Sequence, residues 1–274
     1  MTGVVILSAA FAGILGLLVG SFLNVVVYRV PAGMSVVRPR SSCPRCGHEI
    51  SAIENIPVLS WLALRGRCRS CAQPISARYP LVELGGAVAF ALVAAWIVTG
   101  TSPTMTPAAA LRLAALLYLA AITIALALID LDVHRLPNAI VVPSYAVGAV
   151  LLGASGLLAG DFVGLARAAA GAGASVLFYT ILALVKPGGM GLGDVKLAGV
   201  LGMYLGAAGW AQLAVGTIAA FVLGGTVAVI LLIAQRARRT DGLPFGPWML
   251  AGAWTGLVVG APAADMYLHL AGLR

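Results

Sequence analysis

Long apolar segments separated by short polar ones dominate the pattern of this chain. A transmembrane helix needs roughly 20 mostly apolar residues, and most of these segments approach or exceed that length. Their apolar residues are continuous rather than alternating, which favours helices over the strands of a membrane barrel. We therefore expect an all-α polytopic membrane protein with about eight transmembrane helices. The expected spans are residues 3–27, 80–99, 109–130, 138–159, 164–186, 195–209, 211–235 and 247–271.

Composition agrees with this pattern. The 274 residues are 61% hydrophobic and 9% charged, whereas soluble domains carry about 25% charged residues. The first apolar segment has no basic region before it and is long enough to remain as an anchor, so we expect no cleavable signal peptide.

The basic residues predict the orientation of the chain in its membrane. Residues 28–79 form the one long polar loop, with eight arginines against Glu49 and Glu54. If this loop is cytoplasmic, that side carries 14 Lys and Arg residues and the other side carries 3, as the positive-inside rule requires. The net charge of +8 is thus a topology signal, and we expect the bilayer as a partner and no nucleic acid.

All four cysteines lie in this loop, as the pairs Cys43/Cys46 and Cys68/Cys71 with 21 residues between the pairs. This spacing is typical of a zinc ribbon, in which four thiolates close a structural rather than a catalytic site. Disulfides are the alternative, but they need an oxidising compartment, and a cytoplasmic loop favours metal. We expect His48 to be a surface residue rather than a fifth ligand.

Two aspartates at the ends of apolar segments are the candidates for chemistry. Asp130 ends one segment, and Asp194 follows the glycines Gly191 and Gly193 at the start of another. Ionisable residues at a membrane edge are functional candidates, and a close carboxylate pair can act as general acid and base. The glycines would allow close backbone approach to Asp194. The alternative is that these aspartates, or Asp132, merely cap the neighbouring helices.

Other polar and aromatic features have ordinary structural interpretations. Residues 53–62 read as a short amphipathic helix on the membrane surface. Asn24 could satisfy the backbone of a neighbouring helix. In Phe245–Trp248 a proline opens a helix and a tryptophan lies at the membrane interface.

Several motifs together give the chain a family resemblance. They are Gly20–Pro31, the two cysteine pairs with Glu54–Leu62 between them, Arg78–Glu83, Ile129–Asp132 with Leu136–Asn138, Gly191–Lys196 and Pro244–Pro247. In this order they resemble the bacterial type IV prepilin peptidases, also called leader peptidase/N-methyltransferases.

The resemblance implies cleavage of the basic leader from type IV prepilins and type II secretion pseudopilins at the cytoplasmic face of the inner membrane. It implies Asp130 and Asp194 as the catalytic pair, with Asp132 in reserve, and zinc on the four cysteines. It also implies N-methylation of the new N-terminus with S-adenosylmethionine. Substrate- or cofactor-binding candidates are Gly191, Gly193, Asn24 and Glu54.

The expected organisation is a first transmembrane helix at residues 1–27, a cytoplasmic cysteine loop and methylation region at 28–79, and a membrane-embedded peptidase domain at 80–274. Glu49, Glu54 or Glu83 could attract a basic leader, although the arginine excess of the loop opposes this. Two other classes remain as alternatives. A transporter would place its carboxylates near mid-membrane, often with inverted repeats, and a zinc-ribbon scaffold would leave Gly191–Asp194 without a role.

Overall fold

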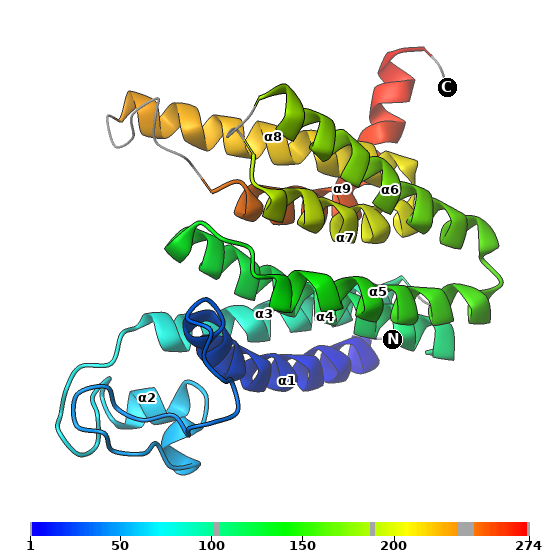
Figure 1. Cartoon of the computed structure of the whole chain (residues 1–274). Helices are drawn as coiled ribbons and strands as arrows, with labels where there is room; N and C mark the ends of the chain where they lie inside the picture. The colour runs from blue at the N-terminus through cyan, green and yellow to red at the C-terminus, as the bar shows by residue number, and fades with distance from the viewer. Residues whose placement is uncertain (1, 101–104, 187–189, 235–243, 273–274) are drawn as a thin grey trace. The chain divides into compact units, whose positions relative to one another are not determined.

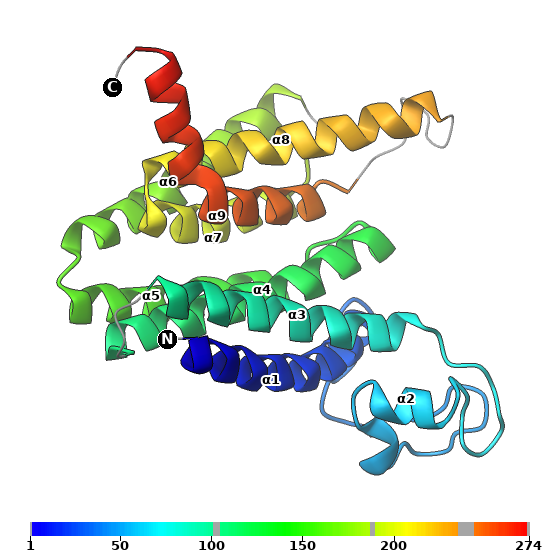
Figure 2. The same cartoon turned by 180° about the vertical axis from the view of Figure 1, so that it is seen from behind.

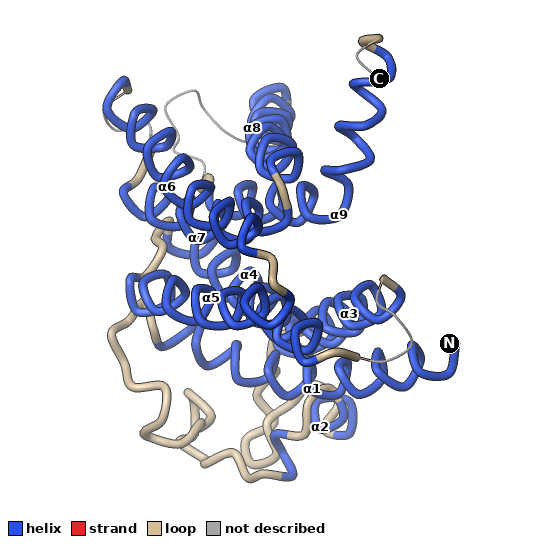
Figure 3. Tube along the Cα trace, turned by 90° about the vertical axis from the view of Figure 1, so that its right-hand side faces the viewer, coloured by secondary structure: helices blue, strands red, loops and turns tan. Residues whose placement is uncertain are grey.

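The computed structural model of the chain describes residues 2–100, 105–186, 190–234 and 244–272. Within these ranges the regular structure is helical, with isolated bridges but no strand, as Figure 3 shows. The expectation of an all-α fold is therefore confirmed.

The described helices follow the hydropathy pattern closely. They are α1 (Thr2–Arg29), the 3₁₀ turn η1 (Ile53–Asn55), α2 (Leu59–Ala63), α3 (Arg78–Thr99), α4 (Pro107–Val133), α5 (Asn138–Ala159), α6 (Phe162–Val185), α7 (Leu192–Ala208), α8 (Trp210–Ile233) and α9 (Gly246–Leu270). Every long helix begins and ends within about three residues of an expected span. Six of them, α1, α3, α4, α5, α6 and α8, are long and apolar enough to cross a membrane. Because α7 and α9 are not among these six, eight crossings remain a prediction.

The chain divides into two compact units, Met1–Ala125 and Leu126–Arg274. In the first unit α1 and α3 lie side by side, and the loop that carries α2 extends beyond one end of both helices (Figures 1 and 2). A Cβ on Gly16 would collide with the carbonyl oxygen of Gly86, and a Cβ on Gly86 would collide with that of Gly16. Paired glycines of this kind let membrane helices approach closely.

In the second unit α6 packs on α7 and α8 packs on α9. Reciprocal glycine contacts occur again, between Gly171 and Gly202 and between Gly216 and Gly252. Helix α7 is buried along nearly its whole length and also contacts α5, α8 and α9. A helix that is apolar all round is typically a core helix, and α7 is the one whose first turn carries Asp194.

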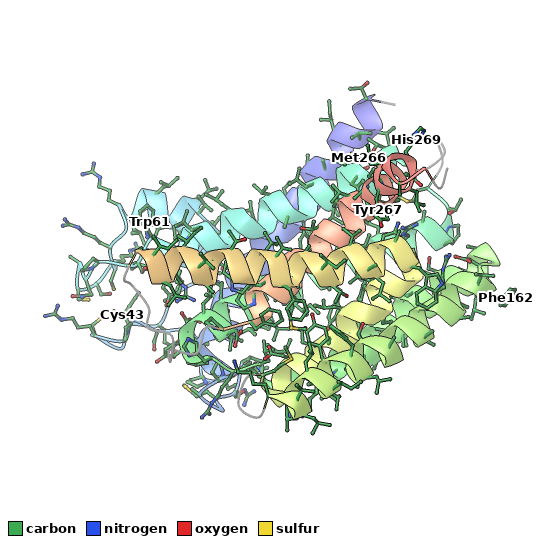
Figure 4. The ribbon with its side chains drawn as sticks, turned by 90° about the horizontal axis from the view of Figure 1, so that it is seen from above. Cys43, Trp61, Phe162, Met266, Tyr267 and His269 are labelled. Atoms are coloured by element: carbon green, nitrogen blue, oxygen red, sulfur yellow. The ribbon has the colours of Figure 1, made fainter. Side chains whose placement is uncertain are left out.

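Helix α9 changes direction in its second half, where it contains Pro262 (Figure 2). Proline removes a backbone hydrogen bond and is a usual cause of a kink. Beyond it, Met266, Tyr267 and His269 lie together near the end of the helix (Figure 4).

The two compact units do not show what each segment of the chain does. The predicted division into residues 1–27, 28–79 and 80–274 therefore remains a prediction.

Candidate active site and cysteine cluster

Asp130 lies in the last turn of α4, and its side chain is buried with an exposed fraction of 5%. Its Oδ2 atom accepts a hydrogen bond of 3.0 Å from the backbone N–H of Gly246 at the start of α9. The alternative interpretation, in which Asp130 caps α5, the next helix in the chain, is therefore wrong for this residue. A buried polar group needs such a partner, since burial without one is costly.

Asp194 lies in the first turn of α7 and is half-buried. Its Oδ2 atom accepts a hydrogen bond of 3.1 Å from the backbone N–H of Gly191. Asp194 thus does stabilise the start of its own helix, as the capping interpretation held. A Cβ on Gly191 would lie 3.4 Å from the same oxygen, an ordinary contact, so this hydrogen bond does not by itself require glycine.

The two aspartates, 64 residues apart in sequence, lie in the same region of the folded unit. Their carboxylates lie close enough for their charges to interact. Leu136 connects the two sites, because it packs within 3.1 Å of a Cβ position on Gly193 and 3.2 Å of one on Gly246. The sequence motifs Leu136–Asn138 and Gly191–Lys196 also meet at their other ends, where the Lys196 Nζ donates to Asn138 Oδ1 at 3.1 Å.

The structure separates Asp130 from Asp132. Two residues apart on a helix point about 200° apart around its axis, and Asp132 is exposed whereas Asp130 is buried. The choice of Asp130 as the partner of Asp194 is consistent with this geometry, and its catalytic role remains a proposal.

An aromatic cluster adjoins the aspartates, and its residues do not stand out in the sequence. Tyr179 of α6 is buried and lies close enough to Asp194 for the charge of that carboxylate to act on its hydroxyl group. The Tyr179 ring stacks on Phe221 of α8, with 5.8 Å between the ring centroids. Phe221 in turn contacts Phe245 at 5.1 Å, just before α9. These residues come from three separate segments, so no local pattern in the sequence reveals that they cluster. The cluster places an aromatic ring beside Asp194 and joins α6, α8 and the start of α9.

The four cysteines form a single cluster in the first unit. All four are free thiols, and their sulfur atoms lie within 4.8 Å of one another. The Sγ atoms of Cys43 and Cys71 are 3.8 Å apart, and those of Cys46 and Cys68 are 4.0 Å apart. A tetrahedral site with Zn–S bonds of about 2.3 Å places its sulfurs roughly 3.8 Å apart, whereas a disulfide needs about 2.05 Å. The donor set therefore fits zinc.

Two similar knuckles build the cluster. In the first, Cys43 N–H donates to the His48 carbonyl at 2.9 Å; in the second, Cys68 N–H donates to the Gln73 carbonyl at 2.8 Å. The backbone N–H groups of Cys46 and Arg45 lower the pKa of the Cys43 thiol to about 6. The N–H of His48 acts in the same sense on Cys46, but burial and the neighbouring thiols outweigh it and raise the pKa of Cys46 to about 11. Four thiolates this close need a cation to hold them.

Glu54 supports the cluster from inside the loop. Its side chain is 8% exposed, and its Oε2 accepts the Ser51 N–H at 2.9 Å. The same carboxylate lies 3.3 Å from the His48 Nε2 and 4.0 Å from the Arg69 guanidinium. The hydrogen bonds from Ser51, and then the contact with His48, lower the pKa of Glu54 to about 2. Glu54 thus acts as an internal anchor here, and substrate binding by Glu54 remains a prediction.

One charged residue from each of α1 and α3 fastens the loop to the helices. Buried Arg29 donates to the Ser35 carbonyl at 2.9 Å, and the buried Glu83 carboxylate accepts the Val58 N–H at 2.7 Å. Val58 is the central residue of a γ-turn, with φ of +61° and a 2.6 Å bond from Leu59 N–H to the Pro57 carbonyl. This turn is rare and strained, especially for a β-branched residue, so Glu83 stabilises a costly conformation.

The remaining candidates have structural partners. Asn24 of α1 donates through Nδ2 to the Tyr79 carbonyl of α3 at 3.2 Å, which confirms that it satisfies a neighbouring helix. The segment with Trp61 lies in the same loop as Cys43 (Figure 4), and its Ile53, Leu59 and Leu62 side chains are exposed.

A multi-pass membrane fold that brings two aspartates together beside an aromatic cluster is the construction expected of a membrane-embedded aspartic peptidase. Comparisons with known proteins then identify the family. The description "Bacterial Peptidase A24 N-terminal domain" matches residues 14–97, which include the cysteines, and "Type IV leader peptidase family" matches residues 117–229, which include both aspartates. The chain belongs to the type IV leader peptidase family.

Curated relatives match the chain over nearly its whole length, and each of those described below has the name prepilin leader peptidase/N-methyltransferase. The protein from Burkholderia pseudomallei (strain 1026b) is 38% identical, with 96% of this chain and 88% of the relative covered. The Pseudomonas putida protein is 39% identical, with 91% and 90% covered, and the Aeromonas hydrophila protein is 36% identical, with 92% and 91% covered. No solved structure matches the chain.

Proposed function

We propose that this chain removes the leader peptide from type IV prepilins and type II secretion pseudopilins and that Asp130 and Asp194 are its catalytic pair. One observation carries the proposal: two helices far apart in sequence bring these carboxylates together, and each accepts a backbone N–H from a glycine. The family match supports a peptidase over the transporter and scaffold alternatives.

The mechanism follows from the chemistry of a close carboxylate pair. Two such groups do not ionise together easily, so one proton is shared between them. The ionised aspartate removes a proton from water, which attacks the scissile carbonyl, while the protonated aspartate donates its proton to the carbonyl oxygen. The tetrahedral intermediate then collapses: the leaving amine takes the proton that the first aspartate removed from water, and a hydroxyl of the intermediate returns a proton to the second aspartate. One water is consumed, one peptide bond is broken, and no covalent enzyme intermediate forms.

The cytoplasmic face of the inner membrane is the proposed site of this reaction. The distribution of Lys and Arg supports this orientation, since it places the cysteine loop and the ends of α4 and α7 that carry the aspartates on the same, basic side. A prepilin has a basic leader before a long apolar helix, and an enzyme within the bilayer can hold that helix beside its own spans.

Zinc on Cys43, Cys46, Cys68 and Cys71 is the proposed structural cofactor, supported by the spacing of their sulfur atoms. Four protein ligands leave no open position, so the ion would organise the loop and would take no part in hydrolysis.

N-methylation of the new N-terminus is the second proposed activity, supported by the names of the relatives. When bound, S-adenosylmethionine would supply an electrophilic methyl group to the deprotonated product amine and would be released as S-adenosylhomocysteine. The aspartates lie in the second unit, so we assign methylation to the first unit, which has the cysteine loop.

The decisive experiment is cleavage of a prepilin-type precursor by the purified full chain in detergent, with S-adenosylmethionine present and the products read by mass spectrometry. We expect Asp130→Asn and Asp194→Asn each to lower the cleavage rate about 10²- to 10⁴-fold, the usual contribution of a general acid or base. The intact chain should give a product with the mass gain of one methyl group.

Asp132→Asn is the matched control, because Asp132 lies two residues from Asp130 on the same helix and is exposed. It should cleave at the wild-type rate. Wild-type cleavage by both Asp130→Asn and Asp194→Asn would reject the assignment, and loss of cleavage in Asp132→Asn alone would move the catalytic role to that residue.

A further inference from the structure

Helix α9 begins without a cap of its own. The first backbone N–H groups of a helix have no partner within it, and the preceding residue, Phe245, provides no side-chain hydrogen bond. The partner comes instead from α4: the Gly246 N–H donates to Asp130 Oδ2 at 3.0 Å in a buried environment, across 116 positions in sequence. Asp130 thus caps α9 from a distant part of the chain.

Position 246 also has no space for a side chain. A Cβ there would lie 2.7 Å from Asp130 Oδ2, 3.3 Å from Asp130 Cγ and 3.2 Å from Leu136 Cδ2. Contacts below 3.0 Å force a displacement, and the nearest atom is the carboxylate oxygen itself. The need for glycine therefore arises from close approach to Asp130, since the backbone conformation of Gly246 is not left-handed.

The start of α9 is firmly held. The ring of Phe245 packs on Phe221 at 5.1 Å, and Phe245 and Trp248 both lie 3.2 Å from a Cβ position on Gly224 of α8. The Gly246 N–H is therefore aimed at Asp130 by packed aromatic residues rather than by a free loop. Pre-aligned donors of this kind are effective because they need no reorganisation during the reaction.

We propose that Gly246 is a positioning residue of the peptidase, an inference that rests on the proposed function. Its N–H fixes Oδ2 of Asp130 and leaves Oδ1 for the catalytic water, and its missing side chain keeps the carboxylate in that orientation. The dyad then has a repeated construction, in which a glycine N–H at the start of α9 holds Asp130 and a glycine N–H at the start of α7 holds Asp194.

The first test compares Gly246→Ala with Gly225→Ala in the full chain in detergent. Gly225 lies in α8 and has no atom within 4 Å of a Cβ position, so it is the matched control. We expect Gly246→Ala to lower kcat by about 10- to 100-fold with KM within about threefold, because a misplacement of about 1 Å at a reacting group has an effect of this order. An unchanged kcat, or a raised KM with normal kcat, would overturn the positioning role.

The second test needs no substrate. Melting temperatures are measured for Gly246→Ala, Asp130→Ala and the double variant. Because Asp130→Ala removes the oxygen that the new methyl group would strike, Gly246→Ala should lower the melting temperature less in that background than in the wild type. Additive effects would contradict the contact.

The two tests separate this inference from the proposed function. If Asp130→Asn cleaves normally while the melting cycle still shows coupling, the proposed function is wrong and the contact is real. If Asp130→Asn is inactive but Gly246→Ala cleaves like Gly225→Ala, the positioning role is wrong. If Gly246→Ala is too unstable to assay, Leu136→Ala is added to remove the contact between the new methyl group and Leu136, while the contact with Asp130 remains. This double variant should keep a low kcat, and full recovery of kcat would overturn the proposal.

Discussion

At the residue scale, the position that follows each cysteine pair has the same unusual backbone. Gly47 has φ of +71° and Ala72 has φ of +55°, both in the left-handed region, which costs residues with a Cβ roughly 1–2 kcal/mol. A Cβ on Gly47 would meet no atom within 4 Å. The first knuckle therefore has glycine at this position, which adopts the left-handed conformation readily. The second knuckle has alanine, whose Cβ makes the same conformation unfavourable.

This difference predicts opposite effects of exchanging the residues. Gly47→Ala should weaken zinc binding about fivefold, which corresponds to roughly 1 kcal/mol, because folding of the knuckle and metal binding are coupled. Ala72→Gly should strengthen binding or leave it unchanged. Competition against a chromophoric chelator measures both, and effects of the same sign would show that the left-handed conformation does not limit the affinity.

Sequence reasoning at this scale succeeded where chemistry is local. The CxxC spacing identified the four sulfurs that cluster. The family resemblance favoured Asp130 over Asp132, and the burial of Asp130 is consistent with that choice, which remains a prediction. Sequence reasoning correctly predicted that a helix begins at Phe245–Trp248, but it did not identify the contact of Gly246 with Asp130. Its hydrogen bond joins positions 116 apart, and no local pattern records such a pair. Glu83 was considered only as a contact for the leader, whereas its carboxylate holds the strained turn at Val58.

At the scale of helices, hydropathy located the segments but not their pairing. Apolar length alone predicts where a helix crosses the membrane, whereas the choice of neighbour depends on which small residues face each other. The glycines of α6 illustrate this. Gly171 is buried against Gly202 of α7, while Gly173 of the same helix is exposed with no atom within 4 Å of a Cβ position. The sequence does not distinguish these two glycines.

Leucine substitutions should distinguish them. In Gly171→Leu the added side chain meets the α7 backbone, so we expect a loss of about 1–3 kcal/mol, as for overpacked interiors. Gly173→Leu should leave stability unchanged or slightly raised, since leucine is the better helix former. Thermal unfolding in detergent measures both variants. Equal destabilisation would mean that the α6–α7 contact is not set by Gly171.

At the scale of the whole molecule, each compact unit contains one kind of site. The cysteine cluster with Glu54, Arg29 and Glu83 lies in Met1–Ala125, and the paired aspartates with Gly246 lie in Leu126–Arg274. The sequence motifs indicated both sites and predicted that the cysteine region ends at residue 79, which remains a prediction. The first compact unit also contains α3, which packs on α1 and holds the loop through Glu83.

This separation predicts that the two activities can be uncoupled by removing the metal. A Cys43→Ser/Cys68→Ser double variant takes one thiolate from each knuckle, so zinc should fall from about one ion per chain to a trace, because a structural site needs all four ligands. The loop should then lose its order, and methylation should fall below detection. Cleavage should continue, since no residue of the dyad or its glycine donors lies in the first unit.

The readouts are metal content by elemental analysis and the ratio of methylated to unmethylated product by mass spectrometry. Ser70→Ala, between the second pair of cysteines, is the control that should keep both activities. Loss of cleavage in parallel with zinc would show that the cysteine unit is needed for peptide hydrolysis as well.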